Sequence, residues 1–114
     1  RCEIANEFKA GCFISIHCNA SLNSSAQGLE VFHHPASEAG NRLASAIYQE
    51  LMKLGRNLRG VKQAEFYVLK HTTMPACLVE CGFITNAEEA EWLKAHFKEI
   101  AQALAQGIGN SPNP

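Results

Sequence analysis

The run ACLVECGF, residues 76–83, constrains the fold more than any other stretch, because Glu80 is its only charged residue and the rest are apolar or glycine. A strand that is apolar on both faces must be covered on both, which is typical of a central strand in a sheet flanked by helices. A second buried run, residues 13–16, leads directly into His17. The sequence therefore predicts two buried strands that carry a titratable side chain at or near their exits.

Amphipathic helices alternate with the predicted strands. Apolar residues recur at helical spacing in residues 37–54, which Gly55 follows, and again from Phe97 to Ile108. Asn86, with Glu89 three residues later, predicts an N-cap that opens a short helix before that last one. Residues 1–10 have the pattern of the end of a helix. We expect strands at residues 12–16, 29–32, 64–70 and 76–83.

Strands interleaved with helices predict an α/β fold, with a twisted, mostly parallel sheet and helices on both faces. A chain of 114 residues closes one hydrophobic core, so we expect a single domain.

Composition excludes several classes of partner. The net charge is −1 and neither sign forms a block, which argues against binding to nucleic acid or to an anionic membrane. No apolar run approaches the roughly 18 residues that a membrane span needs. The five cysteines contain no CxxC pair, and this pattern favours free thiols over a disulfide framework or a structural zinc site.

Glu80 is the first candidate for chemistry. By strand alternation it shares a face with Leu78 and Gly82, where desolvation raises the pKa of a carboxyl group unless a cation compensates. It is either a general acid/base that acts on a metal-bound water or a structural residue, which forms a buried salt bridge with a Lys or Arg or caps a neighbouring loop.

His17 is the second candidate, because a neutral imidazole at the end of a strand suits a zinc ion. The alternative is a core histidine bonded to Ser15 or Asn19. His33 and His34 are adjacent, so on a strand they point to opposite faces and do not share an ion. His71 is a candidate for contacting substrate.

The chain has a strong family likeness, which rests on four sequence blocks in a fixed order. These are RCEIAN, FISIHCNA, GLEVF and RGVKQAEFYVLKHTTMPACLVECGFITNAEEAEWL. It resembles the zinc-dependent N-acetylmuramoyl-L-alanine amidases of bacterial autolysins and phage endolysins. The resemblance implies one zinc ion held by two His and one Glu, with a further Glu as catalytic acid/base. It makes His17 a zinc ligand and Glu80 the catalytic carboxylate, with Asn19, Arg59 and His71 as candidate substrate-binding residues.

The resemblance also implies parts that the sequence does not contain. The family's other two zinc ligands, a His and a Glu, are expected upstream of residue 1. We therefore expect residues 1–109 to be a catalytic domain without its N-terminal portion and residues 110–114 to be a flexible tail. The implied substrate is peptidoglycan, and the implied location is extracellular or in the cell envelope, with a signal segment outside this chain.

Two other functions stay open at this point. One is a non-catalytic peptidoglycan-binding module on the same scaffold, which the incomplete metal site favours. The other is a cysteine hydrolase that uses Cys81 or Cys18 with His17, although Cys81 falls on the opposite strand face from Glu80.

Overall fold

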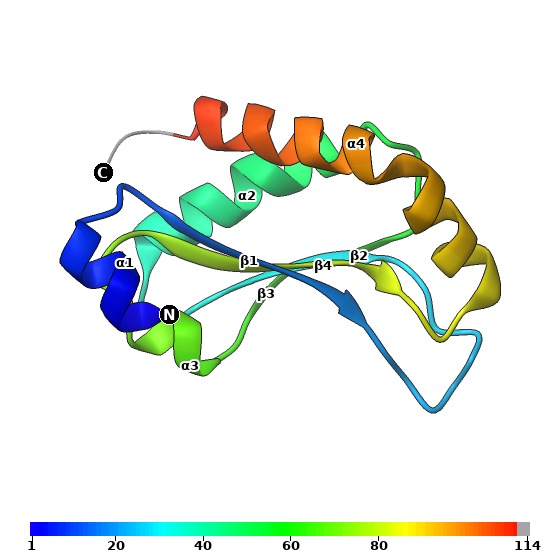
Figure 1. Cartoon of the computed structure of the whole chain (residues 1–114), viewed down its shortest axis with the longest axis horizontal. Coiled ribbons are helices and arrows are strands. Elements are labelled where there is room, and N and C mark those ends of the chain that lie inside the picture. Colours follow the sequence, from blue (N-terminus) through cyan, green and yellow to red (C-terminus); the bar gives the residue numbers. More distant parts are fainter. Residues whose placement is uncertain (112–114) are drawn as a thin grey trace.

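The computed structural model describes residues 1–111 and shows one α/β unit (Figure 1). The elements are, in chain order, α1 (Cys2–Phe8), β1 (Phe13–Asn19), β2 (Leu29–His33), α2 (Glu38–Met52), β3 (Leu58–Gln63), α3 (Tyr67–Lys70), β4 (Ala76–Phe83) and α4 (Ala87–Asn110). The four strands form one sheet in the order β1-β4-β2-β3. The pairs β1/β4 and β2/β3 are parallel and β2/β4 is antiparallel, so the predicted mostly parallel sheet is confirmed.

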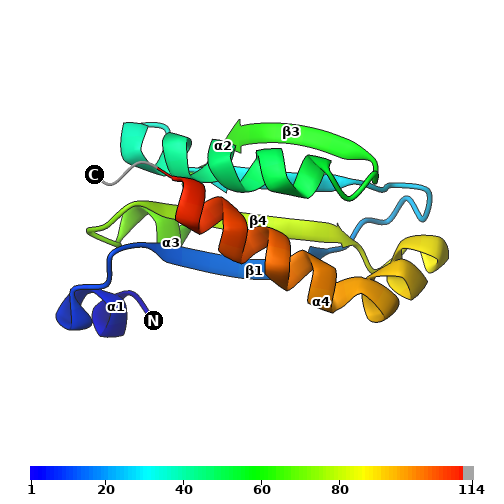
Figure 2. The ribbon, with the colours of Figure 1, turned by 90° about the horizontal axis from the view of Figure 1, so that it is seen from above.

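The two faces of the sheet are covered unequally. Helices α2 and α4 lie on one face, where α2 runs over β2 and β3 and α4 crosses β4 (Figure 2). The main core lies between these helices and the sheet, and its fully buried side chains include Leu29, Val31, Ile47, Leu51, Cys77 and Val79. The other face carries a smaller cluster, in which Leu69 of α3 packs with Ala76 and Leu78. Helices therefore flank both faces, and α3 is a single turn near the start of β4.

One predicted strand is wrong. Residues 64–70 were expected to be extended because they are rich in aromatic and β-branched residues, but β3 lies earlier, at Leu58–Gln63, and Tyr67–Lys70 is helical. Strand propensity describes a side chain that fits a half-buried pleated surface, and here packing overrides it. The Thr72 hydroxyl bonds the Val68 carbonyl at 2.8 Å, and Phe66 packs edge-on against Phe32. Both contacts favour the helical turn.

The other boundaries shift by a few residues. Strand β1 begins one residue later than expected and continues through His17 to Asn19. The two C-terminal helices form one element with a kink at His96, whose φ is −127°. Of the predicted tail, residues 110–114, Asn110 is helical and Ser111 is the C-cap of α4, while residues 112–114 lie outside the described part of the chain.

Glu89 of α4 forms hydrogen bonds that connect α4 with the end of β4 and with the residue before β2. The Asn86 side chain accepts a hydrogen bond from the Glu89 N–H at 3.1 Å, as the predicted N-cap requires. The Glu89 carboxylate, which is buried, does not complete a capping box. It accepts hydrogen bonds from the backbone N–H groups of Phe83 at 2.8 Å and Gly28 at 3.0 Å, so it fixes the end of β4 against the start of β2.

Replacing Glu89 by Ala should lower the free energy of unfolding by about 2–4 kcal/mol, because two buried N–H groups lose a charged acceptor. Glu88→Ala is the matched control, since Glu88 is exposed in the same helical turn and should change stability by less than about 0.5 kcal/mol. Urea unfolding of both variants measures the difference. Equal stability of the two would contradict the role given to Glu89.

Gly107 lets α4 approach α2 closely, because a Cβ at this position would lie 2.5 Å from the Ile47 Cα. Gly107→Ala should therefore destabilise the protein by about 1–3 kcal/mol, even though alanine favours a helix. A Cβ at Gly109, in the same helix, would meet nothing within 4 Å, so Gly109→Ala should be neutral or slightly stabilising. Thermal unfolding that ranks the two variants in the opposite order would refute this packing.

Candidate active site

His17 and Glu80 lie directly opposite each other on neighbouring parallel strands. The register of β1 and β4 pairs His17 with Glu80, and the register of β2 and β4 pairs Glu30 with Glu80. Residues that are paired in a sheet project from the same face. The three side chains therefore form one row across three strands, on the face away from α2 and α4. We call His17, Glu80 and Glu30 the polar row.

The imidazole of His17 has Ser15 as its hydrogen-bond partner. The Ser15 hydroxyl lies 2.7 Å from His17 Nε2, two residues back on the same strand face. Ser15 is buried, whereas His17 is exposed. Of the two partners that the sequence suggested, the structure selects Ser15. An exposed ring with one nitrogen oriented by a buried hydroxyl is compatible with ligation through the other nitrogen.

Glu80 is a partly buried carboxylate with no compensating partner. Its Oε2 atom is buried and has no hydrogen-bond partner within residues 1–111. Burial raises the pKa of Glu80 above its ordinary value, the nearby His17 lowers it, and the charge of Glu30 raises it. No Lys or Arg in the described part of the chain forms an ion pair with Glu80, so the structure gives no support to the alternative of a buried salt bridge.

Glu30, unlike Glu80, forms ion pairs with two cationic side chains, and it was not among the predicted site residues. The Arg59 Nε and Lys62 Nζ atoms lie 2.7 Å and 3.0 Å from Glu30 Oε2, and the Glu30 side chain is 6% exposed. In GLEVF, strand alternation places Glu30 away from the core residues Leu29 and Val31, which predicts an ordinary solvent-facing residue. Its burial depends on cross-strand neighbours that are distant in the sequence.

The predicted substrate-binding residues lie in three different places. Arg59 lies beside the polar row, where it contacts Glu30 and lies over the Phe83 ring at 5.0 Å. Asn19 ends β1, and its side-chain oxygen accepts a hydrogen bond from the Ala20 N–H at 2.9 Å. His71 follows α3, close to the start of β4, and its ring centroid lies 4.1 Å from that of Tyr67 with the two rings tilted by 36°. Arg59 and Asn19 are therefore near the edge of the sheet where β1 and β4 end, and His71 is at the other end of the sheet.

The polar row supplies only part of the ligand set of a catalytic zinc ion. A catalytic zinc site needs three protein ligands and an open position. Within residues 1–111, no group of three or more His, Cys, Asp and Glu side chains could hold a metal ion. His17 and the unpartnered Glu80 fit one ligand and an acid/base group. The remaining ligands would have to come from residues outside the described chain.

The cysteines do not belong to the polar row. All five are free, as expected. Cys18 and Cys81 line an apolar pocket of about 260 Å³ with Ile16 and residues of α4, on the opposite face of the sheet from Glu80. Burial raises the pKa of Cys81 to about 12 and also raises that of Cys18, so neither thiol is an activated nucleophile. This geometry argues against the cysteine-hydrolase alternative.

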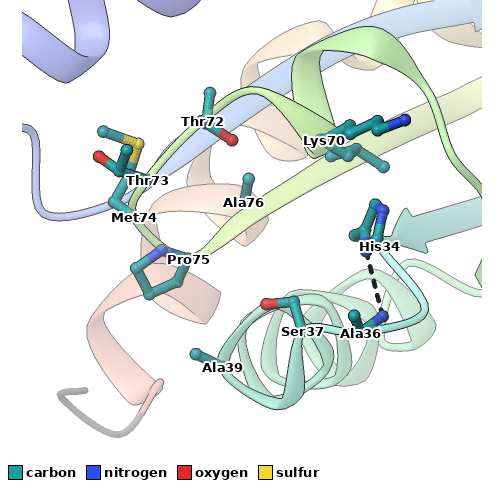
Figure 3. A pocket seen from close by; sticks show the side chains of 11 residues that line it. His34, Ala36, Ser37, Ala39, Lys70, Thr72, Thr73, Met74, Pro75 and Ala76 are labelled. Atoms are coloured by element: carbon teal, nitrogen blue, oxygen red, sulfur yellow. Dashed lines mark hydrogen bonds between the residues drawn. The ribbon is translucent and has the colours of Figure 1, made fainter.

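A larger pocket lies at the far end of the sheet, around the start of β4. It measures about 340 Å³ and is lined by His34, the first residues of α2 and the loop before β4 (Figure 3). Lys70 and His34 border it, and it contains no residue of the polar row. The unpartnered carboxylate beside an imidazole makes the polar row a better candidate for the catalytic centre than this pocket.

The sequence of the chain is similar to those of known proteins. A family model described as N-acetylmuramoyl-L-alanine amidase matches residues 1–110. The chain is 46% identical over 104 residues to the N-acetylmuramoyl-L-alanine amidase LytC of Bacillus subtilis, which covers 87% of this chain and 21% of LytC. It is 35% identical to the endolysin of Bacillus phage SPP1, covering 99% of this chain and 44% of the endolysin.

The fold has close solved counterparts. The catalytic domain of the amidase CwlV from Bacillus (Paenibacillus) polymyxa superposes with a TM-score of 0.87 at 33% identity, over 94% of this chain and 60% of that domain. The CwlD amidase of Clostridioides difficile gives a TM-score of 0.88 at 33% identity, over 94% of this chain and 57% of CwlD. The chain thus spans less than two thirds of the length of these relatives, and it belongs to the N-acetylmuramoyl-L-alanine amidase family.

Proposed function

We propose that the protein carrying this chain hydrolyses the amide bond between the lactyl group of N-acetylmuramic acid and the L-alanine of the peptidoglycan stem peptide. The observation that carries the proposal is the pairing of His17 with Glu80, whose buried Oε2 has no partner within residues 1–111. Membership of the amidase family gives the pair its substrate class.

Glu80 has the surroundings of a general acid/base. A carboxylate without a cation or hydrogen-bond donor keeps its lone pairs available, and its raised pKa brings it closer to neutral pH, where proton transfer in both directions is efficient. In the proposed reaction, Glu80 accepts a proton from water as the water oxygen bonds to the amide carbon. It then delivers a proton to the alanine nitrogen as the C–N bond breaks.

His17 is proposed as the zinc ligand of this chain. Enzymes of this family are generally zinc-dependent. A zinc ion bound here would polarise the substrate carbonyl and lower the pKa of its water. We propose that a His and a Glu upstream of residue 1 complete the ligand set, because residues 1–111 hold no three-ligand group.

The proposed substrate also sets the proposed location. Peptidoglycan lies outside the cytoplasmic membrane, so the enzyme would act outside the cell or in the cell envelope. Within residues 1–111, no helix is both long and apolar enough to cross a membrane.

Asn19, Arg59 and His71 remain proposed contacts to the substrate, and among them Arg59 is the one that lies beside the polar row.

A non-catalytic peptidoglycan-binding module is the second candidate. The missing three-ligand group within residues 1–111 favours it. The partly buried Glu80 argues against it, because a binding module gains nothing from an uncompensated carboxylate. Zinc titration of the full-length protein, together with release of N-terminal alanine from purified cell walls, separates the two. A catalytic protein binds zinc and releases alanine, and a binding module adsorbs to the walls without releasing it.

Glu80→Gln in the full-length protein should lower the rate of alanine release by about 10²- to 10⁴-fold, because the amide cannot accept the proton of water. Zinc content should stay at the wild-type value. Glu91→Gln is the control, since Glu91 is exposed on α4 and away from the polar row. Activity of Glu80→Gln equal to that of Glu91→Gln would remove Glu80 from the mechanism.

His17→Ala should weaken zinc binding by more than about 100-fold, because a direct ligand matters at least as much as the groups that orient it. Elemental analysis of the purified full-length protein measures this directly and does not depend on activity. His34→Ala, which removes an imidazole beside the far pocket, should keep its zinc. Equal zinc content in the two variants would refute the ligand assignment.

A further inference from the structure

Two cationic side chains form ion pairs with one carboxylate of the polar row. Arg59 and Lys62, which we call the basic pair, both contact Glu30 Oε2, at 2.7 Å and 3.0 Å. One ion pair is enough to offset the charge of Glu30, so the second cation needs another explanation. Neither cation forms an ion pair with Glu80, within residues 1–111.

Strand register places Lys62 on the face of the polar row. Glu30 pairs with Gly60 of β3, and Lys62 lies two residues further along the same strand, so both project from one face. Leu29 pairs with Leu58, which leaves Arg59 as an extra residue in β3. Such a bulge re-aims a side chain, and here Arg59 reaches Glu30 as well.

The bulge is held in place from the other side of the sheet. Gly60 has a φ of +99°, which favours glycine, and its backbone N–H donates to the Tyr48 hydroxyl at 3.1 Å. The direction of Arg59 is therefore fixed by the backbone and by α2, not by its contact with Glu30 alone.

The basic pair has capacity for another anion. The side chains of Arg59 and Lys62 are 39% and 40% exposed, so solvent and ligands reach both. A lysine ammonium has three N–H donors. Within residues 1–111, the Lys62 ammonium has Glu30 as its one hydrogen-bond partner. A second carboxylate can therefore bind without breaking the contact to Glu30.

The proposed substrate has such carboxylates on one side of the scissile bond only. The glycan is neutral there, because its N-acetyl groups carry no charge and the lactyl carboxyl group is part of the amide. The stem peptide carries the negative charge, beginning with the free carboxyl group of the glutamate that follows L-alanine.

We infer that the basic pair, with Lys62 as its exposed member, binds a free carboxylate of the stem peptide and makes the enzyme selective for it. The inference rests on the proposed function and adds to it a preference among peptidoglycans. Those in which this glutamate carries a carboxylate are better substrates than those in which it is amidated. Lys62 is then a specificity residue that takes no part in the bond cleavage.

The test uses two muropeptides that differ only in this group, one with a carboxylate and one with a carboxamide on the glutamate. The full-length zinc protein should show a higher kcat/KM for the carboxylate form. Lys62→Met should lower kcat/KM for the carboxylate form by about 10-fold and leave the carboxamide form unchanged, which is the effect expected for one charge-assisted hydrogen bond. Lys62→Arg should keep the preference. Lys98→Met, a change at an exposed lysine on α4, should match the wild type on both substrates.

Binding is measured separately, by calorimetry with the Glu80→Gln protein and with Glu80→Gln combined with Lys62→Met. A preference for the carboxylate form that disappears with Lys62→Met supports the inference. Equal losses on both muropeptides, or no preference in either measurement, overturn it. If the wild type cleaves neither substrate but the binding preference is present, the proposed function fails while the role of Lys62 stands.

Discussion

The position of β4 between two strands of different direction is the constraint on which the site depends. β4 runs parallel to β1 and antiparallel to β2, and it is buried on both faces. A slip of one residue in either register would turn its apolar residues to the wrong face, so burial fixes both registers. The same registers bring His17 and Glu30 to the two sides of Glu80. The geometry of the polar row thus follows from packing of the core on the opposite face.

The two carboxylates of the polar row have different surroundings, and this difference suggests different roles. Glu30 is almost fully buried and has two cations on one oxygen, so its charge is well compensated. Glu80 has no such partner, and burial raises its pKa. A compensated carboxylate stabilises the site and orients the basic pair, whereas an uncompensated one is available for proton transfer.

The sequence predicted the parts of this structure that depend on local pattern. The runs around His17 and Glu80 are apolar enough to predict buried strands. The alternation of side chains along a strand also predicted that Glu80 and Cys81 point to opposite faces of the sheet. The strand prediction for the segment after β3 was wrong, because the packing of Phe66 and Leu69 overrides strand propensity. Glu30 and Lys62 were missed because their roles depend on pairing between β2, β3 and β4, and no local spacing encodes that pairing. The ligand role of His17 and the catalytic role of Glu80 remain predictions.

The most direct test of the central claim is a crystal structure of the full-length zinc protein, with anomalous scattering recorded at the zinc edge. The account predicts one strong anomalous peak about 2.0–2.1 Å from a ring nitrogen of His17, with the Glu80 carboxylate within hydrogen-bond distance of a water bound to the ion. A peak that lies elsewhere in the molecule, with His17 and Glu80 both away from it, would contradict the claim that the polar row is the hydrolytic centre.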